Sequence, residues 1–296
     1  MSILVFGSVN ADLVFSVPRL PAPGETVLGK GFAQFPGGKG ANQAVAAARD
    51  GAAVAFAGCV GRDGLAGAAT AALREAGVDL ARLAEVAAPT GCASICVDAE
   101  GRNQIAVAPG ANALARAAQV EDAALTPATI LLLQMEVPAA EIALLVQRAA
   151  ARFTRCILNL APPGDLPADL LRALHLLVLN EHEAVVLARR LGCTPDAAAL
   201  RLAAGCDVAV TRGAAGAEAA TAAGLATTPA FPVRPIDTTG AGDTWCGVLA
   251  AGLARGMPMA DAMRRAAAAA ALACTRPGAA AAMPWAAETD GLLATP

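Results

Sequence analysis

Residues 130–151 read ILLLQMEVPAAEIALLVQRAAA, an apolar run of strand type followed by an alanine-rich segment of helix type. A continuous apolar strand is typical of a parallel sheet that helices cover on both faces. The same order recurs along the chain, so we predict an α/β fold with a doubly wound, mostly parallel sheet flanked by helices. Further strand-type runs occur at 3–9, 54–60, 156–161, 176–180 and 207–213, and helix-type segments at 39–49, 65–76 and 183–191.

Two segments interrupt this alternation. Residues 12–36 and 90–108 alternate in polarity between turn signals and contain no helical pattern, so each is predicted to form a β-hairpin. The two hairpins could pair into a small second sheet that covers a site as a lid. A length of 296 residues would also fit two smaller domains, but we expect one domain, 1–296, with a discontinuous β lid at about 12–36 and 90–108.

The composition argues against several classes of partner. The formal charge is −3 without any block of Lys or Arg, so we expect neither a nucleic acid nor a membrane as partner. The longest apolar block, 266–274, is far shorter than the roughly 20 residues of a membrane span, and no secretory signal is visible. Two histidines and eight scattered cysteines favour neither zinc nor a disulfide scaffold, so a cytoplasmic location fits best.

A glycine-rich turn precedes the last long apolar segment. Residues 237–247 read DTTGAGDTWCG, and such a turn at a helix start presents free backbone N–H groups and a positive dipole end, which bind phosphate. Asp243 lies in that first turn, where a carboxylate competes with a bound anion. Either Asp243 only caps the helix, or it has a chemical task beside the phosphate.

Polar residues also follow two of the predicted strands. Asn10 and Asp12 come after the first strand, and Glu136 ends the run at 130–136. In open α/β sheets the carboxyl ends of the strands hold the ligand, although each residue alone could equally be a solvated loop residue.

A second glycine-rich entry to a helix, PGGKGANQ at 36–43, is not a P-loop. A P-loop needs glycine at Ala33 and a hydroxyl residue at Gly40. Its free N–H groups and Asn42 suit a polyhydroxyl ligand, whereas a plain turn before a helix is the alternative. The GxGxxG pattern of dinucleotide-binding folds is absent after the first strand.

Two later strand ends allow a structural or a functional interpretation. Asn180 followed by Glu183 matches a helix-capping box, but the same pair could lie beside hydrated Mg²⁺ and nucleotide phosphates. The segment TRGAAG at 211–216 could pass close to a nucleotide or form an ordinary hairpin turn.

The motifs are more specific together than singly. In order, GSVNAD, GGKGANQA, QME, NEHE, TRGAAG, DTTGAGDTWCG and CTRPGA closely resemble the ribokinase branch of the PfkB carbohydrate kinase family, over essentially the whole chain. The resemblance implies a doubly wound core, a β lid that often forms a homodimer contact, and phosphoryl transfer from ATP to a sugar hydroxyl.

The resemblance also assigns residues to roles. Asp243 would be the general base, and the turn of Gly240, Ala241, Gly242 and Asp243 would be the anion hole. The sugar would lie among Asn10, Asp12, Gly38, Lys39, Asn42, Glu136 and Asp243. ATP would lie against Asn180, Thr211, Arg212, Gly213, Gly216 and Gly242, with Glu183 near Mg²⁺, and K⁺ would bind the loop positions Asp237, Thr239, Ala273, Arg276 and Gly278.

Five positions depart from the family pattern. Ala282 replaces a hydroxyl residue, which leaves one K⁺ ligand in question. Trp245 and Cys246 replace the more usual Phe and Asn, and we expect them to face the helix packing. Cys92 and Ser94 replace bulkier apolar lid residues, which could change how the lid covers the sugar.

The predicted reaction is therefore ATP plus ribose giving ADP plus ribose 5-phosphate. A ketohexose, 2-keto-3-deoxygluconate or nucleoside kinase of the same family remains an alternative, although aromatic residues for a base pocket are scarce. A non-catalytic sugar-binding regulator and an NAD-dependent dehydrogenase are less favoured.

Overall fold

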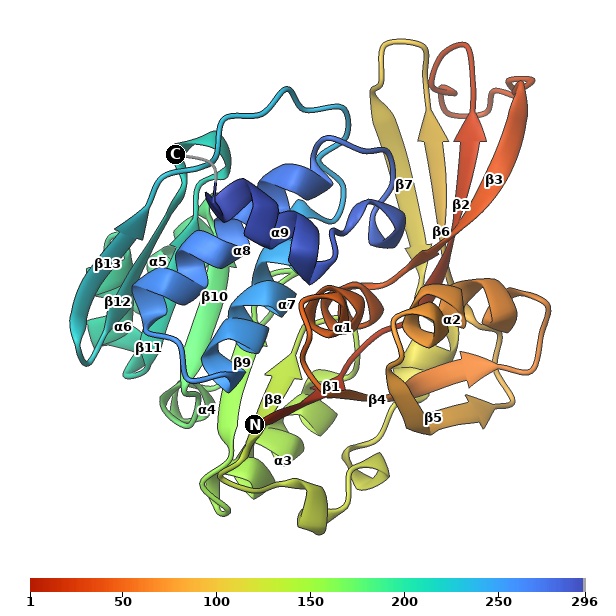
Figure 1. The fold of residues 1–296 in the computed structure, drawn as a ribbon. Helices are drawn as coiled ribbons and strands as arrows, with labels where there is room; N and C mark the ends of the chain where they lie inside the picture. Colours follow the sequence, from red (N-terminus) through yellow and green to blue (C-terminus); the bar gives the residue numbers. More distant parts are fainter. Residues whose placement is uncertain (295–296) are drawn as a thin grey trace.

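The computed structural model describes residues 1–294 and has two sheets (Figure 1). The larger sheet has nine strands in the order β13-β12-β11-β10-β9-β8-β1-β4-β5. Every neighbouring pair from β11 to β5 is parallel, and only β12 and β13 are antiparallel. The strands are β1 Ser2–Phe6, β4 Val54–Gly61, β5 Asp79–Val86, β8 Thr129–Leu133, β9 Arg155–Asn159, β10 Leu176–Asn180, β11 Asp207–Thr211, β12 Ala217–Thr221 and β13 Gly224–Thr228.

Helices cover both faces of this sheet. Successive side chains of a strand point to opposite faces, and in these strands the side chains on both faces are apolar. Ile3 and Val5 pack with α1, α2, α7 and α8, whereas Leu4 and Phe6 pack with α3 to α6. The doubly wound, mostly parallel architecture is thus confirmed. The helices are α1 Lys39–Arg49, α2 Leu65–Glu75, α3 Ala139–Ala150, α4 Ala168–Arg172, α5 Glu181–Leu191, α6 Ala197–Ala204, α7 Ala241–Ala254, α8 Met259–Ala273 and α9 Ala286–Ala294.

Between these elements lie five 3₁₀ helices. They are η1 Gly110–Leu114, η2 Ala117–Gln119, η3 Asp122–Ala124, η4 Gly213–Ala215 and η5 Ala280–Ala282. Within residues 1–294, no helix combines the length and the apolar character needed to cross a membrane.

The smaller sheet is formed by the two segments that interrupt the main pattern. Its order is β3-β2-β6-β7, with β2 at Asn10–Ser16, β3 at Gly31–Gly37, β6 at Gly91–Val97 and β7 at Asn103–Ala108. The two antiparallel hairpins join through the parallel pair β2 and β6. In Figure 1 this sheet stands beside the main body and projects beyond it. We call it the lid; that it covers a ligand remains a prediction.

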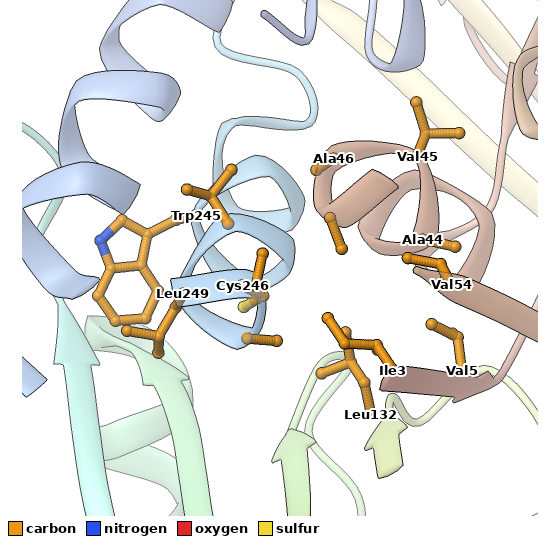
Figure 2. Packing of buried hydrophobic residues seen from close by; sticks show 14 of the residues in the cluster. Ile3, Val5, Ala44, Val45, Ala46, Val54, Leu132, Trp245, Cys246 and Leu249 are labelled. Carbon is orange, nitrogen blue, oxygen red and sulfur yellow. The ribbon is translucent and has the colours of Figure 1, made fainter. Parts of the chain in front are cut away.

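Helices α1 and α7 pack side by side on the sheet (Figure 2). Gly247 makes the close approach possible, because a Cβ atom there would lie 2.4 Å from the backbone oxygen of Gln43. Trp245 and Cys246 are 4% and 2% exposed and belong to the core under these helices, as expected. This packing brings the first turns of the two helices together.

Candidate active site

Three of the seven residues predicted to bind a sugar line a cavity of about 500 Å³, whereas Asp12, Gly38, Asn42 and Asp243 do not line it. Asn10, Lys39 and Glu136 line it, and Val107 of β7 contributes from the lid. The cavity lies where β1 and β8 end and α1 begins, which is the expected ligand position of an open α/β sheet. Other lining residues are Pro109, Asn112, Ala113, Met135, Val137, Pro138 and Pro162.

Asp243 is 8% exposed and does not cap its own helix. Its Oδ2 accepts a hydrogen bond from Asn42 Nδ2 at 2.9 Å, and its Oδ1 accepts one from Gln43 Nε2 at 3.0 Å. Both donors belong to α1, so the capping interpretation of Asp243 is wrong. Burial raises the pKa of Asp243, and Lys39 together with these two donors opposes the rise.

The turn before Asp243 has the conformation that its glycines allow. Gly240 has φ of 75°, and a Cβ atom there would lie 3.0 Å from Ala279. Ala241 N donates to Thr238 O at 3.2 Å, so one of the four N–H groups assigned to the anion hole is used within the turn. Gly242 is exposed, and apart from its chain neighbours and the backbone of its own helix no atom of residues 1–294 lies within 4 Å of its Cβ position. Its N–H and that of Asp243 have no acceptor within the described chain.

Charges of both signs lie close together around the cavity. Burial, and after it the charges of Glu136 and Asp243, raise the pKa of Asp12 to about 6, against the effect of Lys39. The carboxylate of Asp243 raises the pKa of Lys39 despite burial. Gly37 leaves room for Asp12, because a Cβ at Gly37 would lie 2.3 Å from the Asp12 carboxyl group. The ammonium group of Lys39 therefore lies among the three carboxylates of Asp12, Glu136 and Asp243.

Glu136 is fixed by two donors. Its Oε2 accepts from Ser8 Oγ at 2.6 Å and from Lys39 N at 2.9 Å, and Ser8 Oγ accepts in turn from Gly40 N at 3.2 Å. Gly38 has φ of 88°, and a Cβ atom there would lie 2.9 Å from Asn10 N. The GGKGAN turn thus packs directly on the end of β1.

Asn112 is a site residue that the sequence motifs did not identify. It is 1% exposed, its Oδ1 accepts from Val9 N at 2.9 Å, and its Nδ2 donates to Asn10 Oδ1 at 2.7 Å. Because Asn10 Oδ1 is engaged, the amide group of Asn10 can present its Nδ2 to the cavity. A Cβ at Gly91 would lie 2.2 Å from Asn112 Nδ2, so the lid strand β6 must begin with glycine here.

Asn180 and Glu183 form the capping box. Glu183 Oε2 accepts from Asn180 N at 2.7 Å, and Glu183 Oε1 accepts from Asn180 Nδ2 at 2.9 Å. Burial raises the pKa of Glu183, and the charges of Lys39 and Asp243 also act on it, so α5 begins near the first turns of α1 and α7. The capping interpretation is confirmed, and the nucleotide role is compatible with it.

The segment 211–216 forms a hairpin. Arg212 N donates to Gly216 O at 2.7 Å, and β11 and β12 pair antiparallel on either side. The Arg212 side chain pairs with Glu218 at 2.6 Å. Thr211 and Gly213 thus lie at the end of β11, next to Asn180 at the end of β10.

The two loops assigned to a monovalent cation lie side by side. Asp237 Oδ1 accepts from Thr239 N at 2.9 Å, and Asp237 Oδ2 accepts from Gly278 N at 2.8 Å. Ala273 O accepts from Arg276 N at 3.3 Å, while the Arg276 side chain pairs with Glu288. Ala282 is 0% exposed and has no hydroxyl group. Position 282 therefore offers no side-chain oxygen to a cation between these loops.

The expectation for Cys92 and Ser94 is wrong. In the register of β2 and β6, Asp12 lies opposite Ala93, so Asp12 and Ala93 share one face and Cys92 and Ser94 lie on the other. Val107 pairs with Ala93 and lines the cavity. Val107 therefore lines the cavity from the lid, and Ala93 shares its face.

Comparison with known proteins agrees with this geometry. The model of the pfkB family of carbohydrate kinases matches residues 1–286. The chain belongs to this family. Its carbohydrate kinase membership removes the dehydrogenase alternative.

Ribokinases are among its most similar relatives. The chain is 37% identical to the ribokinase of Bacillus subtilis, with 99% of both chains covered. The solved ribokinase of Thermotoga maritima superposes with a TM-score of 0.90 at 31% identity, covering 99% of both chains. An Arabidopsis thaliana ribokinase solved with ribose and ATP gives the same TM-score at 29% identity, covering 100% of this chain and 99% of that one.

Proposed function

We propose that the protein transfers the γ-phosphoryl group of ATP to the 5-hydroxyl of D-ribose, giving ADP and ribose 5-phosphate. The observation that carries this proposal is Asp243: a buried carboxylate, held by two side-chain donors, beside the open backbone of Gly242 at a helix start. The ribokinases that the chain resembles, one of them solved with ribose and ATP, support the choice of substrates.

In this reaction Asp243 accepts the hydroxyl proton as the new O–P bond forms and the bond to ADP breaks. A carboxylate has about four lone-pair sites, so the bonds from Asn42 and Gln43 leave a site free for this proton. The free N–H groups of Gly242 and Asp243 lie at the positive end of the α7 dipole, where they would stabilise the charge on the transferring group.

The sugar would lie in the cavity between α1 and the lid. Asn10 and Lys39 provide donors and Glu136 an acceptor, and Asp12 adds a carboxylate from the lid base. The backbone at Gly38 and the free Oδ1 of Asn42, which is buried without a partner in residues 1–294, complete the polar surface. Such a surface suits an acceptor with several hydroxyl groups.

ATP would lie over Gly242, along the ends of β10 and β11. Asn180 and the turn of Thr211, Arg212, Gly213 and Gly216 form that edge. Both oxygens of Glu183 are engaged by the cap, and no cluster of three metal-ligating side chains occurs within residues 1–294. Glu183 therefore fits Mg²⁺ through water, and the bound ion would neutralise phosphate charge.

We also propose activation by K⁺. Backbone oxygens of Asp237, Thr239, Ala273, Arg276 and Gly278 would hold the ion, which would order the turn that leads into Gly240. Because Ala282 offers no hydroxyl, activation should be weaker than in the Ala282→Ser variant. Equal rates in K⁺-containing and K⁺-free Tris buffer would remove the cation from this proposal.

The lid is the proposed homodimer contact. Apolar side chains are exposed on both of its faces: Phe32 60%, Ile105 53% and Val107 56%.

We also propose a reducing, cytoplasmic location. The eight cysteines, all free thiols, support it.

A coupled ADP-release assay across several acceptors tests the proposed substrate. We expect kcat/KM for ribose to exceed that for fructose, 2-keto-3-deoxygluconate and adenosine by at least about 10²-fold, with 2-deoxyribose intermediate, because unpaired buried polar groups penalise a poor fit. Faster turnover of a hexose or nucleoside would support the kinase activity but overturn ribose as the substrate. No turnover of any acceptor would favour a sugar-binding regulator.

A further inference from the structure

A chain of buried polar side chains connects the main sheet to Asp243. Gln134, which follows β8, donates from Nε2 to Gln43 Oε1 at 2.7 Å. Gln43 Nε2 then donates to two acceptors, Asn159 Oδ1 and Asp243 Oδ1, each at 3.0 Å. Gln43 and Gln134 are 0% exposed and do not line the cavity. None of these three amide side chains has a role in the proposed chemistry so far.

The bonds fix the direction in which the Gln43 amide points. Its Oε1 already accepts from Gln134, and Asn159 is oriented by donating from Nδ2 to Val178 O at 3.3 Å. A flipped Gln43 amide would place its oxygen against the oxygens of Asn159 and Asp243 and leave buried acceptors unpaired, which is costly. Gln43 therefore keeps an N–H directed at Asp243.

We propose that Gln43, anchored by Gln134 and Asn159, is a positioning residue that fixes the rotation of the Asp243 carboxylate toward the acceptor hydroxyl. The outer torsion of an aspartate is broad, so a single donor would leave the carboxylate free to rotate. Here Asn42 holds Oδ2 and Gln43 holds Oδ1, and both donors come from one helix turn. This inference rests on the proposed role of Asp243 as the base.

The same contact affects the charge state of Asp243. The hydrogen bond from Gln43 lowers the pKa of Asp243 against the larger effect of burial. Removing that donor should raise the pKa, while the surrounding charges stay in place. The titratable groups that interact with Asp243 are Lys39 on α1, Asp12 on β2, Glu136 after β8, Glu183 on α5 and Cys246 on α7.

The test compares Gln43→Met and Gln134→Met with Thr70→Val, a control that loses a buried hydroxyl on α2. Steady-state kcat, KM for the sugar, pH profiles and thermal unfolding are measured for each variant. We expect Gln43→Met to lower kcat by about 10²-fold with little change in KM, because a misplaced reacting group is costly. Its acidic limb should move to higher pH. Gln134→Met should show the same changes to a smaller extent, and Thr70→Val should show neither.

Wild-type kcat and an unshifted acidic limb in Gln43→Met would overturn the inference, as would a loss of kcat that is equal at every pH. If Gln43→Met does not fold, an unshifted limb in Gln134→Met overturns it instead. An error in the proposed substrate would be recognised independently of the variants, because wild-type protein would then not phosphorylate ribose. In that case the variants are compared on the acceptor of the panel that wild type does phosphorylate.

Discussion

The floor of the site and the lid beside it are held in different ways. The floor, which we define as Asn42, Gln43, Gln134, Asn159 and Asp243, is buried and linked by hydrogen bonds between side chains of α1, α7 and the main sheet. The lid strand β7 is an edge strand whose six residues are all exposed. The floor is therefore set before any ligand binds, whereas under our proposal the lid would gain its packing partner from a ligand or another chain.

This contrast assigns chemistry to the floor and retention of the sugar to the lid. Substitutions in the floor should lower kcat, and substitutions in the lid should raise KM. The following predictions test that division.

The largest effect is expected for Asp243→Asn. Loss of a positioned general base should lower kcat by about 10²–10⁴-fold with folding retained. The matched control is Asp261→Asn, because Asp261 is the third residue of α8 as Asp243 is of α7, but is exposed. An ADP-release assay should separate the two variants. Equal activity of both would mean that Asp243 serves only the structure of the floor.

Gly240→Ala should have the next largest effect. The added methyl group would press on Ala279 and shift the turn that carries Gly242, so we expect kcat to fall by about 10²–10³-fold, as for a lost oxyanion donor. Gly256→Ala is the control, since Gly256 also has positive φ, 83°, but open space around it. Both variants should lose stability by about 1–2 kcal/mol. Only Gly240→Ala should lose activity. Similar activities of the two variants would show that the conformation of the turn does not affect phosphoryl transfer.

Asp12, at the base of the lid, should make ribose binding depend on pH. Its pKa of about 6 means that the carboxylate is ionised above that pH and protonated below it. We expect ribose affinity, measured by calorimetry, to fall by up to about tenfold per pH unit below 6. In Asp12→Asn the affinity should be weaker and independent of pH, and a retained pH dependence would assign the titration to another group.

The raised pKa of Asp12 also affects the stability of the fold. Its effect on the free energy of unfolding has the opposite pH dependence to its effect on ribose affinity. Because the folded pKa of Asp12 is raised from 3.8, the folded state binds more protons than the unfolded state between about pH 4 and 6. The free energy of unfolding should therefore fall as pH rises through this window. Asp12→Asn should flatten that part of the profile in urea unfolding experiments.

Val107→Ser should have the smallest effect on catalysis. Val107 lines the cavity from β7, so its loss should raise KM for ribose by about tenfold or less and leave kcat unchanged. Ala106→Ser, one residue away on the opposite face, is the control and should leave KM unchanged. A fall in kcat for Val107→Ser would show that the lid takes part in the chemical step.

The sequence predicted elements whose pattern is local. The strand predicted at 176–180 has the bounds of β10, and the helix predicted at 39–49 has the bounds of α1. The run predicted at 130–136 contains β8, which already ends at Leu133. The strand predicted at 3–9 is instead β1, ending at Phe6, after which the chain crosses to the lid. Strand β5 was not predicted, because at the edge of the sheet it carries polar residues without regular alternation.

Residues that act through contacts across the fold were harder to predict. Asp243 and Glu136 lie in recognisable motifs, but Asn112 meets Asn10 across 102 residues and Gln134 meets Gln43 across 91. No local pattern marks such partners, because tertiary packing alone brings them together. Cys92 and Ser94 do lie in the lid, but the sequence did not show on which face. Strand register decides the face, and sequence patterns do not fix the register of a lid that is exposed on both faces.

The most direct test of the division between floor and lid is a rapid-quench measurement of phosphoryl transfer in a single turnover, with saturating ATP and ribose. Wild type, Asp243→Asn and Val107→Ser are compared, with ribose affinity measured in parallel. We predict that the transfer rate falls about 10²–10⁴-fold in Asp243→Asn alone, while ribose affinity falls in Val107→Ser alone. Transfer at the wild-type rate in Asp243→Asn would contradict the assignment of the chemistry to the floor.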